Sequence, residues 1–172
     1  FSKKKLPYIQ NLQRKSIKET YELLKNLCFC NLKKYHQKRI IFIGGVPGSG
    51  KTLIALQFLY NYNHFVNNKE IMEQRNINKE MYGNGAIYIS GNGPLVNVLQ
   101  YQIDEALNKK GLGKAYIKGT MKFKIDYMSN KKVPDYNVIL FDEAQRAWDE
   151  DKMKTNNLSE ADIILEICDK IY

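Results

Sequence analysis

Residues 45–52 read Gly-Val-Pro-Gly-Ser-Gly-Lys-Thr, and this stretch decides the fold expected for the chain. It matches the pattern G-x-x-x-x-G-K-[ST] at every fixed position. Glycines at positions 45, 48 and 50 let the backbone turn inward, so that its N–H groups can approach phosphate oxygens closely. Lys51 supplies a cation for the β- and γ-phosphates, and the Thr52 hydroxyl is a ligand for Mg²⁺. We therefore expect a nucleoside triphosphate to bind to Gly45, Val46, Pro47, Gly48, Ser49, Gly50, Lys51 and Thr52.

The segments on either side of this loop have the patterns of a buried strand and a helix. Arg39–Gly45 is a nearly continuous apolar run, typical of a strand buried in a parallel sheet. After Lys51, apolar residues return at helical spacing, with Leu53, Leu56 and Tyr60 predicted on one face and Ile54, Phe58 and Leu59 beside it. A helix that begins at the loop would add the positive end of its dipole to the phosphate site.

Two acids follow a second apolar run further along the chain. Val138–Phe141 predicts a buried strand, and Asp142 and Glu143 come directly after it. Such a strand would carry Asp142 to the carboxyl edge of the sheet, where ligands bind in open α/β folds. There Asp142 can hold the Mg²⁺ shell together with Thr52, and Glu143 can orient and deprotonate an attacking water. The pattern predicts Mg²⁺-dependent hydrolysis, with Glu143 and Lys51 as catalytic residues.

Further strands and helices alternate along the chain. Ala86–Ser90 is another apolar strand, and the helix after it has Pro94 in its first turn and Gly111 at its end. Residues 63–85 are polar and Asn-rich, which favours a surface excursion with one helical turn near 71–75. The apolar face of the helix after Pro94 is expected to comprise Leu95, Val98, Leu99, Ile103 and Leu107.

Three other segments carry helical signals. Residues 114–131 fit a helix through Ile117, Met121, Ile125 and Met128, although Phe123, Ile125 and Tyr127 alternate as in a strand; we favour the helix. Ser159 and Asp162 resemble a capping box at the start of a last helix. Near the N-terminus, one helical face is predicted to hold Ile17, Tyr21, Leu24 and Leu27.

Alternating strands and helices predict an α/β fold: a P-loop NTPase with a parallel sheet flanked by helices, as an incomplete RecA-like core. We expect residues 1–38 to form a basic N-terminal helical segment and residues 39–172 to form the N-terminal half of the NTPase core. The chain begins with Phe1 and ends at Tyr172 within an apolar helical pattern, so we expect it to be part of a longer polypeptide.

Composition narrows the classes of protein. Hydrophobic residues make up 44% of the chain, which argues against wholesale disorder. No apolar run reaches the roughly 20 residues needed to span a bilayer, and no signal peptide is evident, so we expect a cytoplasmic protein without a membrane partner. The net charge of +9 fits a nucleic-acid partner, although a general drift towards Lys and Asn would also produce it. Cys28, Cys30 and Cys168 lack the spacing of a zinc site.

Three motifs occur in a characteristic order: GVPGSGKT, then YISGNGPLV at 88–96, then FDEAQRAW at 141–148. In this order they resemble the Schlafen group 3-like DNA/RNA helicase-type domain family, from about Arg39 to Trp148. That family looks like superfamily 1 helicases, which implies ATP and Mg²⁺ as cofactors and single-stranded DNA or RNA as partner. The resemblance also implies that Gln145 senses the γ-phosphate and that Ser90–Pro94 contacts a nucleic-acid backbone. For Trp148, a core aromatic is favoured over a base-stacking platform.

Departures from the family pattern leave alternatives open. A later strand normally lies between the strand of the glycine-rich loop and the acidic strand; this strand, the arginine finger and the second motor half are not evident here. We therefore expect the chain alone to be inactive or weakly active. A PhoH-like or AAA-type ATPase acting on RNA or protein, and a non-catalytic nucleotide-binding fragment, remain as alternatives. ATP is favoured because the GTP motif N-K-x-D is absent, and Gln13 and Gln37 are candidates for reading adenine.

Overall fold

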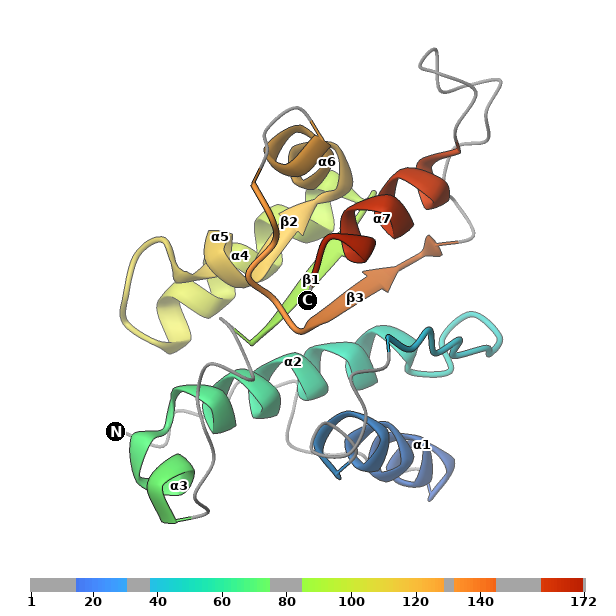
Figure 1. Cartoon of the computed structure of the whole chain (residues 1–172). Helices are drawn as coiled ribbons and strands as arrows, with labels where there is room; N and C mark the ends of the chain where they lie inside the picture. Colours follow the sequence, from blue (N-terminus) through green and yellow to red (C-terminus); the bar gives the residue numbers. More distant parts are fainter. Residues whose placement is uncertain (1–14, 31–37, 75–84, 129–131, 145–158, 172) are drawn as a thin grey trace.

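A parallel sheet of three strands forms the centre of the structure, a computed structural model that describes residues 15–30, 38–74, 85–128, 132–144 and 159–171 (Figure 1). The strands are β1 (Ala86–Ser90), β2 (Ile117–Gly119) and β3 (Val138–Asp142), in the order β2-β1-β3. Both pairings are parallel, with Ser90 beside Asp142 at the carboxyl end of the β1–β3 pair. The predicted α/β class, the strands at 86–90 and 138–141 and the parallel arrangement are confirmed.

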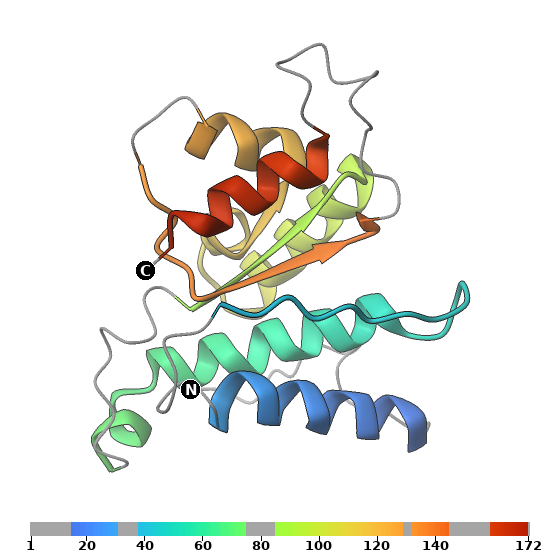
Figure 2. The same cartoon turned by 45° about the vertical axis from the view of Figure 1, so that its right-hand side comes forward.

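Helices cover both faces of this sheet, as Figures 1 and 2 show. One face packs against α2 (Lys51–Asn67) and α4 (Gly93–Ala106), and the other against α6 (Thr120–Met128) and α7 (Glu160–Asp169). Because side chains alternate along a strand, β1 serves both layers. Ala86 and Tyr88 belong to the core on the α2 side, whereas Ile87 and Ile89 belong to the core on the α7 side. The sheet is therefore covered on both faces, with β1 fully buried at its centre and β3 half-buried.

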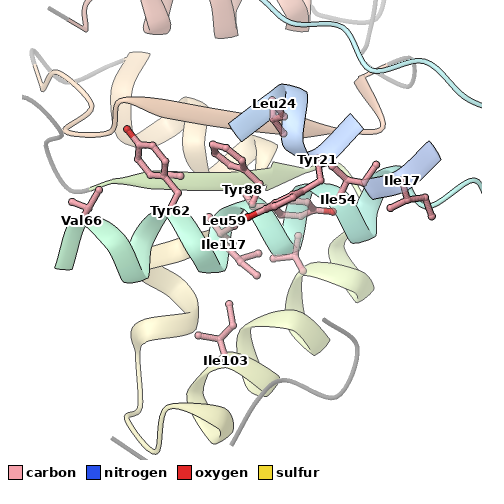
Figure 3. Packing of buried hydrophobic residues seen from close by; sticks show 13 residues of the cluster. Ile17, Tyr21, Leu24, Ile54, Leu59, Tyr62, Val66, Tyr88, Ile103 and Ile117 are labelled. Atoms are coloured by element: carbon pink, nitrogen blue, oxygen red, sulfur yellow. The ribbon is translucent and has the colours of Figure 1, made fainter. Parts of the chain in front are cut away.

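The N-terminal helix packs outside α2. It comprises α1 (Lys15–Lys25), continued by a π-helical turn, η1 (Asn26–Cys30). Its buried face carries Ile17, Tyr21 and Leu24, as the spacing predicted, and Figure 3 shows them beside Ile54 and Leu59 of α2. The Tyr21 hydroxyl also accepts a hydrogen bond from the Asn61 side chain. This apolar face fixes α1 against the helix that follows the glycine-rich loop.

Local signals account for where several helices begin. The side chain of Asn92 caps α4 by accepting from the Leu95 N–H, and Pro94 lies in the first turn. Ser159 and Asp162 form the predicted capping box at the start of α7. Two short helices, α3 (Lys69–Gln74) and α5 (Leu112–Tyr116), complete the described elements. None of the described helices combines the length and apolarity that crossing a membrane requires.

A buried asparagine ties α2 to the start of β1. The Asn63 side chain accepts a hydrogen bond from the Ala86 N–H at 2.6 Å and donates one to the Ala86 carbonyl at 2.9 Å. Gly85, at φ 94°, lies directly beneath this amide, and a Cβ there would meet Asn63 Oδ1. Both the oxygen and the nitrogen of the buried Asn63 amide are therefore hydrogen-bonded inside an otherwise apolar interface.

The prediction of a strand at Arg39–Gly45 is wrong. Residues 38–46 form an irregular segment, and the exposed fractions are 63% for Ile40 and 90% for Phe42. A strand needs a neighbour for its backbone N–H and C=O groups, and within the described residues β3 pairs only with β1. Ile43 alone packs against the core, as a partly buried residue. The apolar composition thus predicted a buried strand, whereas residues 38–46 pair with none of the strands that the structure describes.

The helical faces predicted for α2, α4 and α6 also need correction. In α6, Met121, Ile125 and Met128 are exposed, whereas Phe123 and Lys124 are buried. Residues 114–131 also contain β2, so neither a single helix nor a single strand describes them. In α4, Val98 and Leu107 are exposed and Val96 is buried. In α2 the core face is centred on the neighbours of the predicted face: Ile54, Phe58 and Leu59, which were expected beside it, are buried together with Tyr62, Asn63 and Val66, while Leu53 and Leu56 are partly buried.

Candidate phosphate and metal site

The glycine-rich loop makes its turn with two left-handed residues. Gly48 has φ 74° and Gly50 has φ 99°, in the region that side chains other than glycine rarely adopt. The loop is closed by a hydrogen bond from the Ser49 N–H to the Val46 carbonyl at 3.1 Å, and α2 begins immediately afterwards at Lys51. The loop therefore leads directly into the N-terminus of a helix of 17 residues, as expected for an anion site.

The Lys51 ammonium lies over the loop from which it comes. Its Nζ donates to the carbonyl of Gly45 at 2.6 Å and to that of Val46 at 3.1 Å. These contacts keep the cation close to the backbone amides of residues 48–52. If a phosphate binds there, the Lys51 ammonium can donate to its charged oxygens instead of to the two neutral carbonyls, and the hydrogen bonds to charged oxygens are stronger.

Three residues converge on one carboxylate at the carboxyl end of β3. Asp142 Oδ2 accepts hydrogen bonds from the Thr52 hydroxyl at 2.7 Å and from the Tyr88 hydroxyl at 2.6 Å. The other oxygen, Oδ1, accepts from the Glu143 backbone N–H at 3.0 Å. Thr52 comes from α2, Tyr88 from β1 and Asp142 from β3, so the contact joins all three elements. The predicted pairing of Thr52 with Asp142 is present in the geometry.

Tyr88 is a member of this cluster that sequence reasoning missed. Burial raises the pKa of its hydroxyl, and the hydrogen bond to Asp142 and the charge of that carboxylate raise the pKa further, while a hydrogen bond with Ser90 opposes them. The Tyr88 hydroxyl therefore remains a proton donor at neutral pH. The only hint in the sequence was a tyrosine among aliphatic residues in a strand, two positions before a serine.

Glu143 stands in a backbone conformation that is unusual for its residue type. Its φ is 56°, in the left-handed region, and the residue is half-buried. Such outliers cost of order 1–3 kcal/mol and cluster at functional sites. The turn begins directly after Asp142, so the chain changes direction where the acidic strand ends. This conformation gives Glu143 a fixed position relative to Asp142.

A cavity of about 140 Å³ lies beside the loop. The N-terminal helix forms one wall through Ile17 and Thr20, while the loop and α2 form the others through Gly45, Ser49 and Lys51. A Cβ added to Gly50 would lie 2.9 Å from Ile17 Cδ1. The helix α1 is thus part of the surroundings of the loop, which no sequence pattern had indicated.

The residues present fit Mg²⁺ and a polyphosphate. A hydroxyl and a carboxylate, each an oxygen ligand of the kind Mg²⁺ prefers, lie within 2.7 Å of each other at the end of a parallel strand. A Cβ built on Gly48 meets no atom within 4 Å, so the turn is open on that side. Both features adjoin the N-terminus of α2, which favours negative charge.

The other residues predicted for the site lie at the junction of β1 and α4 or outside the described residues. Ser90 is buried at the end of β1, and its hydroxyl accepts from the Asn92 N–H at 3.2 Å. Gly91, Gly93 and Pro94 are exposed around the start of α4. The candidates Gln13, Gln37, Gln145 and Trp148 lie outside the described residues.

Fold and site together define an α/β domain in which a glycine-rich loop and an acidic strand end meet at the carboxyl edge of a parallel sheet. A family model described as Schlafen group 3, DNA/RNA helicase domain matches residues 38–171, and the chain belongs to this family. No curated protein and no solved structure matches the chain. The resemblance inferred from the three motifs is therefore confirmed.

Proposed function

We propose that the chain binds ATP through Gly45–Thr52 and hydrolyses it with Mg²⁺, as the N-terminal half of a RecA-like P-loop NTPase core formed by residues 39–172. We further propose that residues 1–38 are a separate basic segment that precedes this core. The observation that carries the proposal is the 2.7 Å contact between Thr52 Oγ1 and Asp142 Oδ2. It joins the end of the phosphate-binding motif to the acidic strand, as a shared metal site requires.

Each residue has a distinct role in this proposal. The backbone N–H groups of residues 48–52 bind the phosphates, and Lys51 moves from the carbonyls of Gly45 and Val46 to the β- and γ-phosphate oxygens. Thr52 and Asp142 hold the Mg²⁺, which, when bound, neutralises charge on the phosphate oxygens. Glu143 orients the attacking water and accepts its proton. Gln145 is proposed to report the state of the γ-phosphate.

A nucleic-acid partner is the second part of the proposal. The family name, DNA/RNA helicase domain, and the net charge of +9 support it. Single-stranded DNA or RNA is the proposed ligand, with the exposed residues Gly91, Gly93 and Pro94 at the start of α4 as a contact segment. Pro94 has no N–H and the Leu95 N–H is bonded to Asn92, so a phosphate of the strand would be contacted through the N–H groups of Gly91 and Gly93.

Binding measurements test the nucleotide site. We expect calorimetric titration of the 172-residue chain with ATP to show tighter binding with Mg²⁺ than with EDTA. Lys51→Ala should weaken ATP binding in both conditions by a factor of about 10–100, since a charge-assisted contact is lost. Asp142→Ala should abolish only the effect of Mg²⁺. The matched control is Lys110→Ala, which removes an exposed lysine from the turn before α5.

Two outcomes would contradict this assignment. One is a Lys51→Ala variant that binds ATP as tightly as the wild type. The other is an affinity of the wild type that does not depend on Mg²⁺. The nucleic-acid part is tested separately, by measuring whether single-stranded DNA or RNA of defined length binds to the chain and whether binding falls with rising salt, as phosphate contacts require.

A further inference from the structure

We propose that Tyr88 is a positioning residue of the metal site: its hydroxyl holds the Asp142 carboxylate against Thr52 and thereby sets the affinity of the site for Mg²⁺. The inference rests on the proposed function, because it assumes that Thr52 and Asp142 hold the metal. It assigns a role to a residue that lies outside both the glycine-rich loop and the acidic strand.

The first support is the set of hydrogen bonds around Asp142. A carboxylate at the end of a strand can rotate about two side-chain bonds, and each hydrogen bond removes part of that freedom. The hydrogen bond from Thr52 alone would hold only Oδ2 of Asp142, and only from the side of α2. Tyr88 donates to the same oxygen at 2.6 Å from β1, and the Glu143 N–H occupies the other oxygen at 3.0 Å. Asp142 therefore has donors on both oxygens and from three segments.

The second support is how firmly Tyr88 is held. Its side chain has an exposed fraction of 0% and belongs to the core cluster between the sheet and α2, which Figure 3 shows. In the parallel register Tyr88 lies beside Leu140, so Asp142 is its diagonal neighbour two residues further along β3. An aromatic ring can span this diagonal. A packed ring presents its hydroxyl at a nearly fixed position, which makes it a precise donor.

The third support is the chemistry of such partners. Residues that hydrogen-bond a metal-binding side chain orient it, and their loss commonly reduces metal affinity by about 10-fold to 100-fold. Phenylalanine would fill the same apolar space, so packing alone does not need the hydroxyl. The Tyr88→Phe substitution removes the donor to Asp142 and leaves the loop, Lys51 and the ring contacts unchanged. Its effect should therefore be confined to the metal.

The experiment compares the ATP affinity in Mg²⁺ with that in EDTA for the wild type, Tyr88→Phe and Tyr62→Phe. The ratio of the two affinities measures how tightly the complex of chain and ATP holds Mg²⁺. Tyr62 is the matched control, because it is another tyrosine with 0% exposure in the same cluster, on α2. We expect the ratio to fall about 10-fold or more in Tyr88→Phe and to remain unchanged in Tyr62→Phe. Affinities in EDTA should be equal in all three.

A double-mutant cycle separates positioning from general packing. In an Asp142→Asn background, Tyr88→Phe should have no further effect on the ratio, because the carboxylate it positions is gone. A melting temperature measured without ligands shows whether each variant is folded. If Tyr88→Phe is unfolded, Ser90→Ala replaces it, since Ser90 hydrogen-bonds the Tyr88 hydroxyl, and a smaller fall in the ratio is expected.

An unchanged ratio in the folded Tyr88→Phe variant overturns the inference alone. Equal losses of affinity in Mg²⁺ and in EDTA also overturn it, because they indicate a structural role for the hydroxyl. If the wild type itself shows no Mg²⁺-dependent binding of ATP, the proposed function and the inference fall together. The wild-type measurement therefore distinguishes the two failures.

Discussion

The hydroxyl of Thr52 donates to Oδ2 of Asp142 across 2.7 Å, although 90 positions separate the two residues in the chain. The contact brings the first turn of α2 to the carboxyl end of β3. It excludes an arrangement in which the acidic strand ends on the side of the sheet away from the loop. The proposal of a shared phosphate and metal site depends on this proximity.

Glu143→Gln should separate binding from hydrolysis. The amide cannot accept the proton of an attacking water, and such a loss typically costs a factor of about 100 or more in rate. ATP affinity in Mg²⁺ should stay within about twofold of the wild type, since the loop and Thr52 are untouched. Single-turnover assays with the chain in excess over ATP measure both quantities. Because the chain alone is expected to be at most weakly active, the wild-type rate is measured first; a clear wild-type rate that Glu143→Gln leaves unchanged would rule out Glu143 as the base.

Gly50→Ala should damage the loop itself. Gly50 has φ 99°, and its Cβ would lie 2.9 Å from Ile17 Cδ1, so the substitution meets both backbone strain and a contact with α1. We expect a loss of about 1–2 kcal/mol in the free energy of unfolding and at least a 10-fold loss of ATP affinity. Gly119→Ala is the control, because a Cβ there meets no atom within 4 Å. Urea denaturation and ATP titration check the two effects, and a fully stable Gly50→Ala variant would contradict the loop geometry.

Asn63→Ala should destabilise the fold without touching the site. The N–H and carbonyl of Ala86 would lose a buried hydrogen-bonding partner, at a cost of about 2–4 kcal/mol in the free energy of unfolding. Asn67 is exposed and makes one bond within α2, so Asn67→Ala should cost less than about 0.5 kcal/mol. Urea denaturation of both variants measures the difference. Similar stabilities for the two would show that the link between α2 and β1 is dispensable.

The pair Lys124–Glu160 is the buried ion pair between α6 and α7, with an N–O distance of 2.7 Å and side-chain exposures of 5% and 10%. Lys124→Met should cost about 3–5 kcal/mol in the free energy of unfolding, because a carboxylate remains buried without its ammonium partner. The double variant Lys124→Met/Glu160→Leu should recover most of that loss. A double-mutant cycle by urea denaturation tests this.

An exposed pair provides the comparison for that cycle. Glu22 and Lys25 on α1 have side-chain exposures of 57% and 47%, so their coupling should stay below about 1 kcal/mol. A coupling between Lys124 and Glu160 no larger than this would show that burial adds nothing to their interaction.

Local patterns predicted the parts of the fold that neighbours in sequence determine. The glycine spacing of residues 45–52, the uniform apolar runs of β1 and β3, and the Ser159 cap all act within a few residues, and each was predicted correctly. The approach of Thr52 to Asp142 was also predictable. Residues 38–46 do not form the strand expected before the loop, but α2 packs on the sheet with its N-terminus at the carboxyl end of β3, so the two residues still meet.

Features that depend on distant contacts escaped prediction. The apolar run at 39–45 indicates a preference for burial. Whether it forms a strand depends on the position of a neighbouring strand in the folded chain, which the run itself does not encode. The strand β2 has three residues with Lys118 in the middle, too few to show a period. Tyr88 joins the site only through the register between β1 and β3, which no local pattern encodes. The inward face of α6 includes Lys124, whose partner Glu160 lies 36 positions away in the chain.

The link between Asn63 and Ala86 has a mechanical consequence for the loop. Asn63 lies eleven residues after Thr52, about 16 Å along the axis of α2. The helix is therefore pinned at one end to the start of β1 and at the other to the end of β3. If α2 slid along the sheet, the hydrogen bonds at both Asn63 and Thr52 would break. If α2 tilted slightly about Asn63, only the hydrogen bond between Thr52 and Asp142 would break. Because the attachment at Asn63 is buried and the one at Thr52 is only partly buried, a tilt of α2 would move the glycine-rich loop and leave the start of β1 in place.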